Sequence, residues 1–425
     1  MMTTVRPHAR TRYAFLLLFL SLIGSVVLTP NNIALASTTQ TIAYTGGTYE
    51  PNNPSASRSL IYVNNPEKLI RDDMADLIRN ASNQGPTILS VQGADGGRYR
   101  DFFEHSNGYG SPIGYGIFFY NNGSTTARLT IRGKGFVSGF NASTGQGGGT
   151  PFVQVFSNYN GSNFLQQNIA PGGTYWLRWD SVTGSFSGVV DFDIDFGKLL
   201  IRHVAYTNFA GLPGSYYSQG YVQRFDGQDE RRVYKGVSSR TAALASVNYS
   251  IDSADVNTYL PVTYQSYGGT KTGRSWISSI DKGNNLNGIG SDMASFTQPD
   301  AINPATGQPW VFSATTADAT GRISNLGNWG IVYKTTVTVT NNTNANRAVQ
   351  MVLTPPPAIP GETHYVQFAY FSGSAWVSKN ITIGSGPFPY YTSPSIAPGT
   401  SLTFTAYFVI GAPSYAHLTQ SIFVK

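Results

Sequence analysis

The chain has 425 residues and no cysteine, which excludes a disulfide-held scaffold and leaves buried apolar area to stabilise the fold. Charged residues make up 12% of the sequence, about half the usual share, while Gly, Asn, Ser, Thr and aromatic residues are abundant. The net charge is +6, of which three charges are arginines within the first 12 residues; the remaining +3 is too small and too dispersed for a nucleic-acid-binding surface. This composition is typical of an extracellular protein with many short strands and turns.

The first 36 residues are typical of a cleavable secretory signal peptide. Three arginines precede an apolar block at residues 13–28, and Ala34-Leu35-Ala36 supplies the small residues that signal peptidase requires. We therefore expect a mature chain that begins at Ser37, has a net charge of only +3, and is secreted or associated with the cell surface. The alternative is an uncleaved anchor helix. No later stretch is long and apolar enough for a transmembrane anchor.

Residues 37–60 are rich in Thr, Ser, Asn, Pro and Gly, which predicts a flexible tail. A short helix is predicted over residues 65–80. Asn65 is a good N-cap, Pro66 suits the first helical position, and apolar residues recur at helical spacing after them.

Beyond the predicted helix, the apolar period changes to two, which indicates strands. Residues 115–120 and 127–131 form a predicted hairpin about the Asn121-Asn122-Gly123 turn. Further strands are predicted at residues 151–156, 174–179, 189–196 and 199–206.

The second half of the chain repeats features of the first. Asn341-Asn342 echoes Asn121-Asn122, Ile396-Ala-Pro-Gly399 echoes Ile169-Ala-Pro-Gly172, and the segment around Gly330 echoes the segment around Gly116. We therefore predict an internal duplication in which Gly116 superposes on Gly330 and Pro171 on Pro398.

The predicted fold class is all-β, with two antiparallel β-sandwich domains of immunoglobulin-like or jelly-roll-like type and one short N-terminal helix. After the signal peptide (1–36) and the tail (37–60), residues 61–208 hold the helix and the first sandwich. A linker at 209–236 leads to the second sandwich at 237–425.

Three short motifs carry a resemblance to a known family: Phe102-Phe-Glu-His105, Asn328-Trp-Gly-Ile-Val-Tyr333 and Asn341-Asn-Thr343. In these the chain resembles a family of secreted proteins of unknown function that is most familiar from cyanobacteria. The resemblance implies a secreted protein with two sandwiches. It implies no catalytic residues.

The sequence holds no serine-hydrolase elbow, zinc-protease motif, phosphate loop or dinucleotide fingerprint. The candidate for acid–base chemistry is the cluster of Asp101, Glu104 and His105, because a glycosidase needs only two well-placed carboxyl groups. The adjacent Phe102 and Phe103 favour the alternative, a structural network beside the core.

Asp191, Asp193 and Asp195 alternate with apolar residues, so strand periodicity places all three carboxylates on one face. A calcium site is one interpretation, since calcium prefers clustered carboxylate oxygens. The favoured interpretation is a solvent-facing strand whose charges discourage pairing with other sheets. No other cofactor is expected.

Two groups of tyrosines lie in segments without periodicity. Tyr216, Tyr217 and Tyr221 fall in the predicted linker, and Tyr390 and Tyr391 follow a Pro-rich turn. Aromatic rings on loops suit sugar rings and protein partners, so these five residues are the candidate ligand-binding set. The alternative is that they cover the ends of the sandwiches.

The leading functional hypothesis is a secreted, non-enzymatic protein that binds a cell-envelope polymer, a glycan or another extracellular protein. An extracellular enzyme acting on polysaccharide is the first alternative. A fibre subunit is the second, because Thr41-Ile-Ala-Tyr-Thr45 alternates and could add a strand to a neighbour's sheet.

Overall fold

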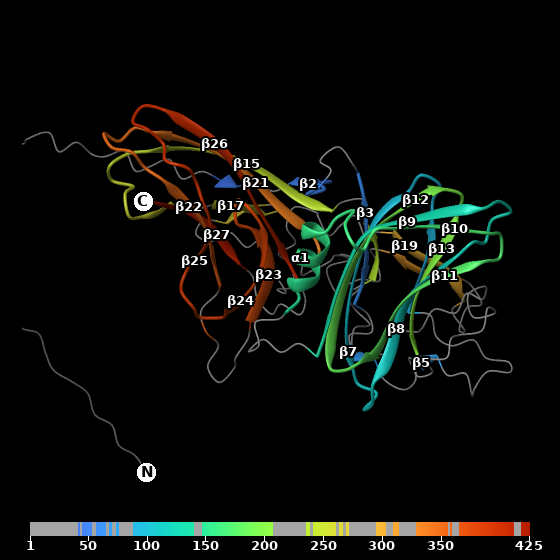
Figure 1. Ribbon diagram of the computed structural model, residues 1–425. Coiled ribbons are helices and arrows are strands. Elements are labelled where there is room, and N and C mark those ends of the chain that lie inside the picture. Colours follow the sequence, from blue (N-terminus) through green and yellow to red (C-terminus); the bar gives the residue numbers. More distant parts are fainter. Residues whose placement is uncertain are drawn as a thin grey trace, which may run out of the picture. The chain divides into compact units, whose positions relative to one another are not determined.

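The structure is a computed structural model. It describes residues 41–42, 45–52, 57–64, 68–69, 74–75, 88–139, 147–206, 235–238, 241–260, 263–266, 269–271, 295–302, 309–313, 329–355, 358, 365–411 and 418–425. Over these ranges the chain is all-β with a single helix, α1 (Thr150–Ser157), which confirms the predicted fold class (Figure 1). Within the described ranges, no helix is both long enough and apolar enough to cross a membrane.

The first sandwich consists of a seven-stranded and a five-stranded sheet. The larger sheet contains, in spatial order, β10 (Leu165–Ile169), β9 (Ala127–Ser138), β12 (Ser185–Phe196), β7 (Arg98–Asn107), β3 (Ser59–Val63) and β14 (Lys235–Ser238), with β4 (Lys68–Leu69) also on β7. The smaller sheet contains β11 (Thr174–Val182), β8 (Ile113–Tyr120), β13 (Leu199–Tyr206) and β5 (Met74–Ala75), with β6 (Leu89–Gly93) also on β13.

Aromatic residues join the two sheets of the first sandwich. The ring of Phe103 from β7 stacks on Tyr115 from β8, with centroids 4.7 Å apart. Phe119 from β8 meets Phe192 from β12 edge to face at 5.0 Å. All four rings are fully buried, so they form the core that the alternating apolar residues predicted.

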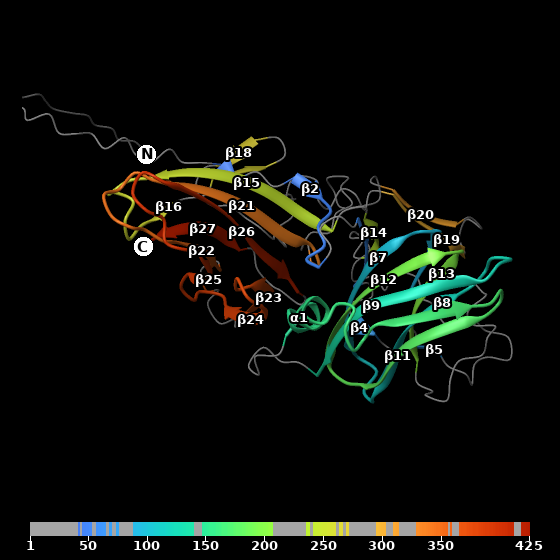
Figure 2. The ribbon, with the colours of Figure 1, turned by 45° about the horizontal axis from the view of Figure 1, so that its top comes forward.

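The second sandwich pairs a six-stranded with a four-stranded sheet. The larger sheet contains β2 (Thr45–Gly47), β15 (Ala242–Ile251), β21 (Val332–Asn341), β26 (Ser401–Ile410), β23 (Tyr365–Phe371) and β24 (Trp376–Thr382). The smaller contains β16 (Tyr259–Leu260), β27 (Thr419–Val424), β22 (Val349–Thr354) and β25 (Phe388–Thr392). Figure 2 shows β15, β21 and β26 side by side, with the β15–β21 pair parallel and the β21–β26 pair antiparallel.

Strands from the predicted tail pair within the chain. β2 pairs with β15, and β1 (Thr41–Ile42) pairs with β17 (Thr263–Ser266), which also pairs with β18 (Gly269–Lys271). Segments that already have partners in their own chain give no support to the fibre hypothesis. A separate hairpin consists of β19 (Ser295–Ile302) and β20 (Pro309–Ser313).

The single helix does not lie where it was predicted. In the segment 65–80, the described residues belong to β4, which pairs with β7, and β5, which pairs with β13. β3 pairs with residues 99–103 of β7, and β4 pairs with residues 106–107 along the same edge. Hydrogen bonding to the free backbone groups of this edge therefore outweighs the local helix propensity of the segment.

Helix α1 replaces the strand predicted at residues 151–156. Phe152, Val155 and Phe156 are buried while Gln154 is exposed, a spacing that fits a helix face and not a strand. Pro151 suits the first turn. The helix lies close against β9 because Gly135 has no side chain, and a Cβ there would come within 2.2 Å of the Pro151 carbonyl oxygen.

The predicted repeat is visible as two equivalent corners, each built on a buried asparagine. The side-chain amide of Asn121 donates to the carbonyls of Thr125 and Ile169, and its Oδ1 accepts from Gly123 N, over 2.8–2.9 Å. Asn341 makes the same three bonds over the same distances. The corresponding partners in the second corner are Ala345, Ile396 and Thr343.

The register around the two corners is also the same. Tyr120 pairs with Thr174 across β8 and β11, while Thr340 pairs with Ser401 across β21 and β26. Pro171 and Pro398 therefore occupy equivalent turns, and the glycine after each has φ +71.

The expected match of Gly116 with Gly330 is wrong. Gly116 lies within β8, opposite Arg178, whereas Gly330 precedes β21 in a turn with φ +81. The register around the corners makes Gly116 equivalent to Thr336 of the second sandwich. Short dipeptide matches in a Gly-rich chain misled the alignment at this point, while the buried asparagines did not.

Candidate functional site

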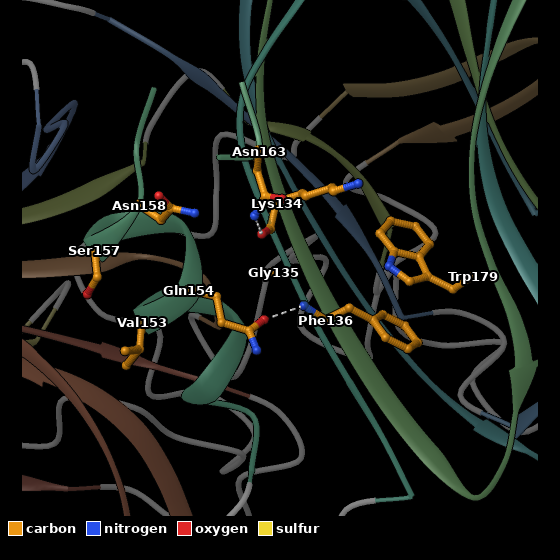
Figure 3. A pocket seen from close by; sticks show the side chains of 9 residues that line it. All are labelled: Lys134, Gly135, Phe136, Val153, Gln154, Ser157, Asn158, Asn163 and Trp179. Carbon is orange, nitrogen blue, oxygen red and sulfur yellow. Dashed lines mark hydrogen bonds between the residues drawn. The ribbon is translucent and has the colours of Figure 1, made fainter. Parts of the chain in front are cut away.

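A cleft of about 510 Å³ lies beside α1 in the first sandwich (Figure 3). Its walls come from the end of β9, from α1 and the turn after it, and from the edge strand β11. The nine lining residues are Lys134, Gly135, Phe136, Val153, Gln154, Ser157, Asn158, Asn163 and Trp179.

The cleft exists because β9 is longer than its neighbour. β10 pairs with β9 only from Ala127 to Ile131, so the remainder of β9 has no strand on that side. Side chains take the place of a strand there. Gln154 Oε1 accepts from the backbone N–H of Phe136 at 2.7 Å, and Asn163 Nδ2 donates to the Lys134 carbonyl at 3.2 Å (Figure 3). The backbone N–H of Asn160 meets the Arg132 carbonyl at 2.7 Å.

An aromatic pair forms one side of the cleft. The rings of Phe136 and Trp179 stack with centroids 5.0 Å apart and an angle of 17°. Trp179 also contacts Phe103 of the core at 5.1 Å, which fixes the position of the indole. Both rings are only partly buried, so they offer apolar surface to a ligand from a rigid support.

The polar lining consists of amides, one hydroxyl and one ammonium group. Asn158 is held by Ser162, donating to its hydroxyl at 2.7 Å and accepting from its backbone N–H at 3.2 Å. None of the nine lining residues is Asp, Glu, His or Cys. The cleft can therefore stack and hydrogen-bond a ligand, but its lining offers no carboxylate pair or imidazole for acid–base chemistry.

The predicted catalytic residues lie elsewhere, on β7, and they do not converge on a groove. Asp101 and His105 face the interior of the sandwich, where Tyr115 and His203 link them. The bonds run from Asp101 Oδ2 to His203 Nε2 (2.8 Å), from His203 Nδ1 to Tyr115 Oη (2.9 Å), and from Tyr115 Oη to His105 Nε2 (3.1 Å). All four groups are fully buried.

Glu104 lies on the opposite face of β7, where its carboxylate accepts from Asn64. Asp101 and Glu104 are thus splayed onto different faces, which removes the paired carboxyls that the enzyme hypothesis required. Burial raises the pKa of Asp101, although the neighbouring His203 opposes this shift.

Asp191 and Asp193 were expected to face solvent, and this is wrong. Both are buried, because arginines from other strands and from the segment before β3 reach them. Arg100 donates to both oxygens of Asp191 at 2.8 Å. Asp193 accepts from Arg58 and from Arg132, each at 2.8 Å.

Asp195 is exposed and accepts from the Thr130 hydroxyl at 2.6 Å. Glu50 completes the cluster by pairing with Arg58 and Arg100, and burial raises its pKa to about 7. The carboxylates are arranged for guanidinium groups, and the described residues contain no group of acids and histidines with metal-binding geometry.

Two of the predicted ligand-binding tyrosines lie in β25 and not on a loop. Tyr390 is 2% exposed, and its hydroxyl accepts from Gln420 Nε2 at 2.6 Å, so it belongs to the core of the second sandwich. Tyr391 is partly buried and stacks on Phe404 at 5.2 Å. Tyr216, Tyr217 and Tyr221 lie outside the described residues.

Sequence reasoning missed the cleft because it missed α1. A strand at 151–156 would pair along β9 and leave no cleft there. Two signals were available: the helical spacing of Phe152, Val155 and Phe156, and the Asn-rich turn at residues 158–163.

No protein-family model matches the chain, and no curated protein matches it. Among solved structures, the chain is 9% identical to the CUB1-EGF-CUB2 domains of rat MASP-1, over 79% of this chain and 96% of that chain, with a TM-score of 0.14. It is also 9% identical to the tandem CBM22 domains of Paenibacillus barcinonensis Xyn10C, over 81% and 91% of the two chains, with a TM-score of 0.15. Likenesses this low carry no argument about function.

Proposed function

We propose that this is an exported, non-enzymatic protein that binds a glycan of the cell envelope or extracellular matrix in the cleft between α1, β9 and β11. The observation that carries the proposal is the combination of the Phe136–Trp179 pair with amides that are already held by the backbone. Aromatic surface suits the apolar face of a sugar ring, and fixed amides suit its hydroxyls.

Fixed amides reduce the entropic cost of binding. One end of Gln154 and one end of Asn163 are bonded to β9, so neither side chain must be immobilised when a ligand arrives. Export is part of the proposal on the evidence of the first 36 residues, where Ala36→Phe should block processing.

The test is binding of the purified chain to a glycan array and to envelope fractions at low and high salt. Trp179→Ala should weaken binding about tenfold or more, because stacking and buried apolar area are both lost. Tyr259→Ala removes a ring that is 49% exposed in the second sandwich, so it is the matched control and should leave binding unchanged.

Trp179 also contacts the core, so a second variant is needed to separate binding from stability. Gln154→Ala removes an exposed side chain and should weaken binding several-fold at a nearly unchanged melting temperature. Full binding by both variants, or no binding of any glycan or envelope fraction by the wild-type chain, would refute the proposal.

A further inference from the structure

Lys134 is a cation without an anionic partner in the cleft. Its side chain is partly buried, it takes part in none of the ion pairs among the described residues, and no acidic side chain lines the cleft with it. Figure 3 shows the side chain extending along the side of the cleft where Trp179 lies. A ligand that covers this ammonium group without neutralising it would incur a desolvation cost.

The neighbouring amides also favour an acidic ligand. Gln154 uses its oxygen on the Phe136 N–H, which leaves Nε2 as a donor. Asn163 uses its nitrogen on the Lys134 carbonyl, which leaves Oδ1 as an acceptor. The cleft thus offers an ammonium group and an amide donor against a single carbonyl acceptor from these side chains.

An extended polypeptide fits these observations less well. A peptide that added a strand to β9 would need the backbone groups of its free edge. Arg132 O, Lys134 O and Phe136 N are already bonded to Asn160, Asn163 and Gln154.

We infer that the ligand is an acidic glycan, whose sugar rings carry a carboxylate or phosphate group, and that Lys134 selects for that group. The inference rests on the proposed function and adds the ligand's charge to it. The ring of the sugar stacks on the Phe136–Trp179 pair while its anionic substituent meets the Lys134 ammonium.

The experiment compares an acidic polymer with its neutral methyl ester. Binding of the full chain to polygalacturonate is measured beside its methyl ester, which keeps the rings and removes the carboxylates. A glycosylated poly(glycerol phosphate) forms the phosphate arm. We expect the acid form, the phosphate polymer or both to bind about five- to tenfold more tightly than the ester, and added salt to reduce that preference.

Lys134→Gln should remove this preference, because it should weaken binding of the anionic polymer more than binding of the ester. Lys198→Gln is the matched control, because Lys198 is an exposed lysine in the turn after β12 and does not line the cleft. If Lys134→Gln weakens binding of the phosphate polymer alone, phosphate is the group that Lys134 recognises.

The inference and the proposed function fail in different ways. The inference is overturned, while glycan binding stands, if neither the acid form nor the phosphate polymer binds more tightly than the ester. It is also overturned if the Lys134→Gln variant keeps the preference for the anionic polymer. Equal loss of acid and ester binding in the Lys134→Gln variant also overturns the inference. Lys134 would then stabilise the cleft without recognising the charge of the ligand. If the wild-type chain binds none of these polymers and no glycan or envelope fraction in the wider screen, the proposed function itself is wrong.

Discussion

The two sandwiches share a corner and differ in the segment inserted after it. In the first, β9 leads into α1 before β10 returns to the corner at Ile169. In the second, β22 is followed by the β23–β24 hairpin before the chain returns at Ile396. The hairpin extends the large sheet, because β23 pairs with β26. The helix adds no strand to a sheet, so the end of β9 beyond Ile131 has no neighbouring strand on that side.

The consequence is clear at one pair of equivalent positions. Trp179 pairs with Tyr115 in the first sandwich, and Ala406 pairs with Thr335 in the second at the same register. Trp179 is partly exposed beside the cleft, while Ala406 is 1% exposed. The shared corner fixes the strands, and the inserted segment decides whether a cleft forms beside them.

The largest effect is expected at the corners. Asn121→Ala and Asn341→Ala should each lower the free energy of unfolding by about 2–4 kcal/mol, because several buried backbone groups lose their partner. Chemical denaturation provides the measurement. Asn122→Ala and Asn342→Ala change exposed neighbours and should cost well under 1 kcal/mol. A large loss at only one of the two corners would break the equivalence.

Gly135→Ala should disturb the packing of α1 on β9. Its new Cβ would collide with the backbone of Pro151, so α1 must shift, at a cost of about 1–3 kcal/mol. Glycan binding should fall with it. Gly386→Ala is the control in the second sandwich, where a Cβ meets nothing within 4 Å. Unchanged binding by Gly135→Ala would show that α1 does not shape the site.

The dependence of stability on pH should arise at Glu50, which lies between β2 and β3 and whose carboxylate pairs with Arg58 and Arg100. The pKa of Glu50 rises from 4.5 to about 7 on folding, because burial disfavours its charged form. Its contribution to stability is therefore complete below pH 4.5 and is lost as the pH rises through 7.

Glu50→Gln should flatten the stability profile between pH 4.5 and 7 by an amount of the order of 2 kcal/mol. Denaturation at a series of pH values tests this. If the free energy of unfolding of the variant still falls with pH over this range, the pH dependence arises from another titratable group.

The smallest effect is expected for Tyr390→Phe. The hydroxyl loses one hydrogen bond with Gln420, which should cost about 1 kcal/mol and leave glycan binding unchanged. A variant of full stability with weakened binding would return Tyr390 to the ligand-binding set.

The sequence was informative where periodicity and turn chemistry agree. Strand alternation predicted two sandwiches, and Asn121 and Asn341 marked equivalent corners because their amides serve the same backbone groups. The sequence-based predictions failed where contacts with distant parts of the chain determine the structure. The buried state of Asp191 depends on Arg100, and strand pairing at Lys68–Leu69 depends on a vacant edge of β7. The cleft depends on α1, whose helical spacing of apolar residues covers only two turns and was taken for a strand.

The asparagine corner also has a consequence for the chain's conformational entropy. The bond from Asn121 to Ile169 spans 48 residues, and the bond from Asn341 to Ile396 spans 55. The entropic cost of closing a loop grows only with the logarithm of its length, so these two closures differ by about 0.1 kcal/mol. A corner clamped in this way tolerates a helix, a hairpin or a longer segment between its ends at nearly the same cost, which leaves that segment free to diverge.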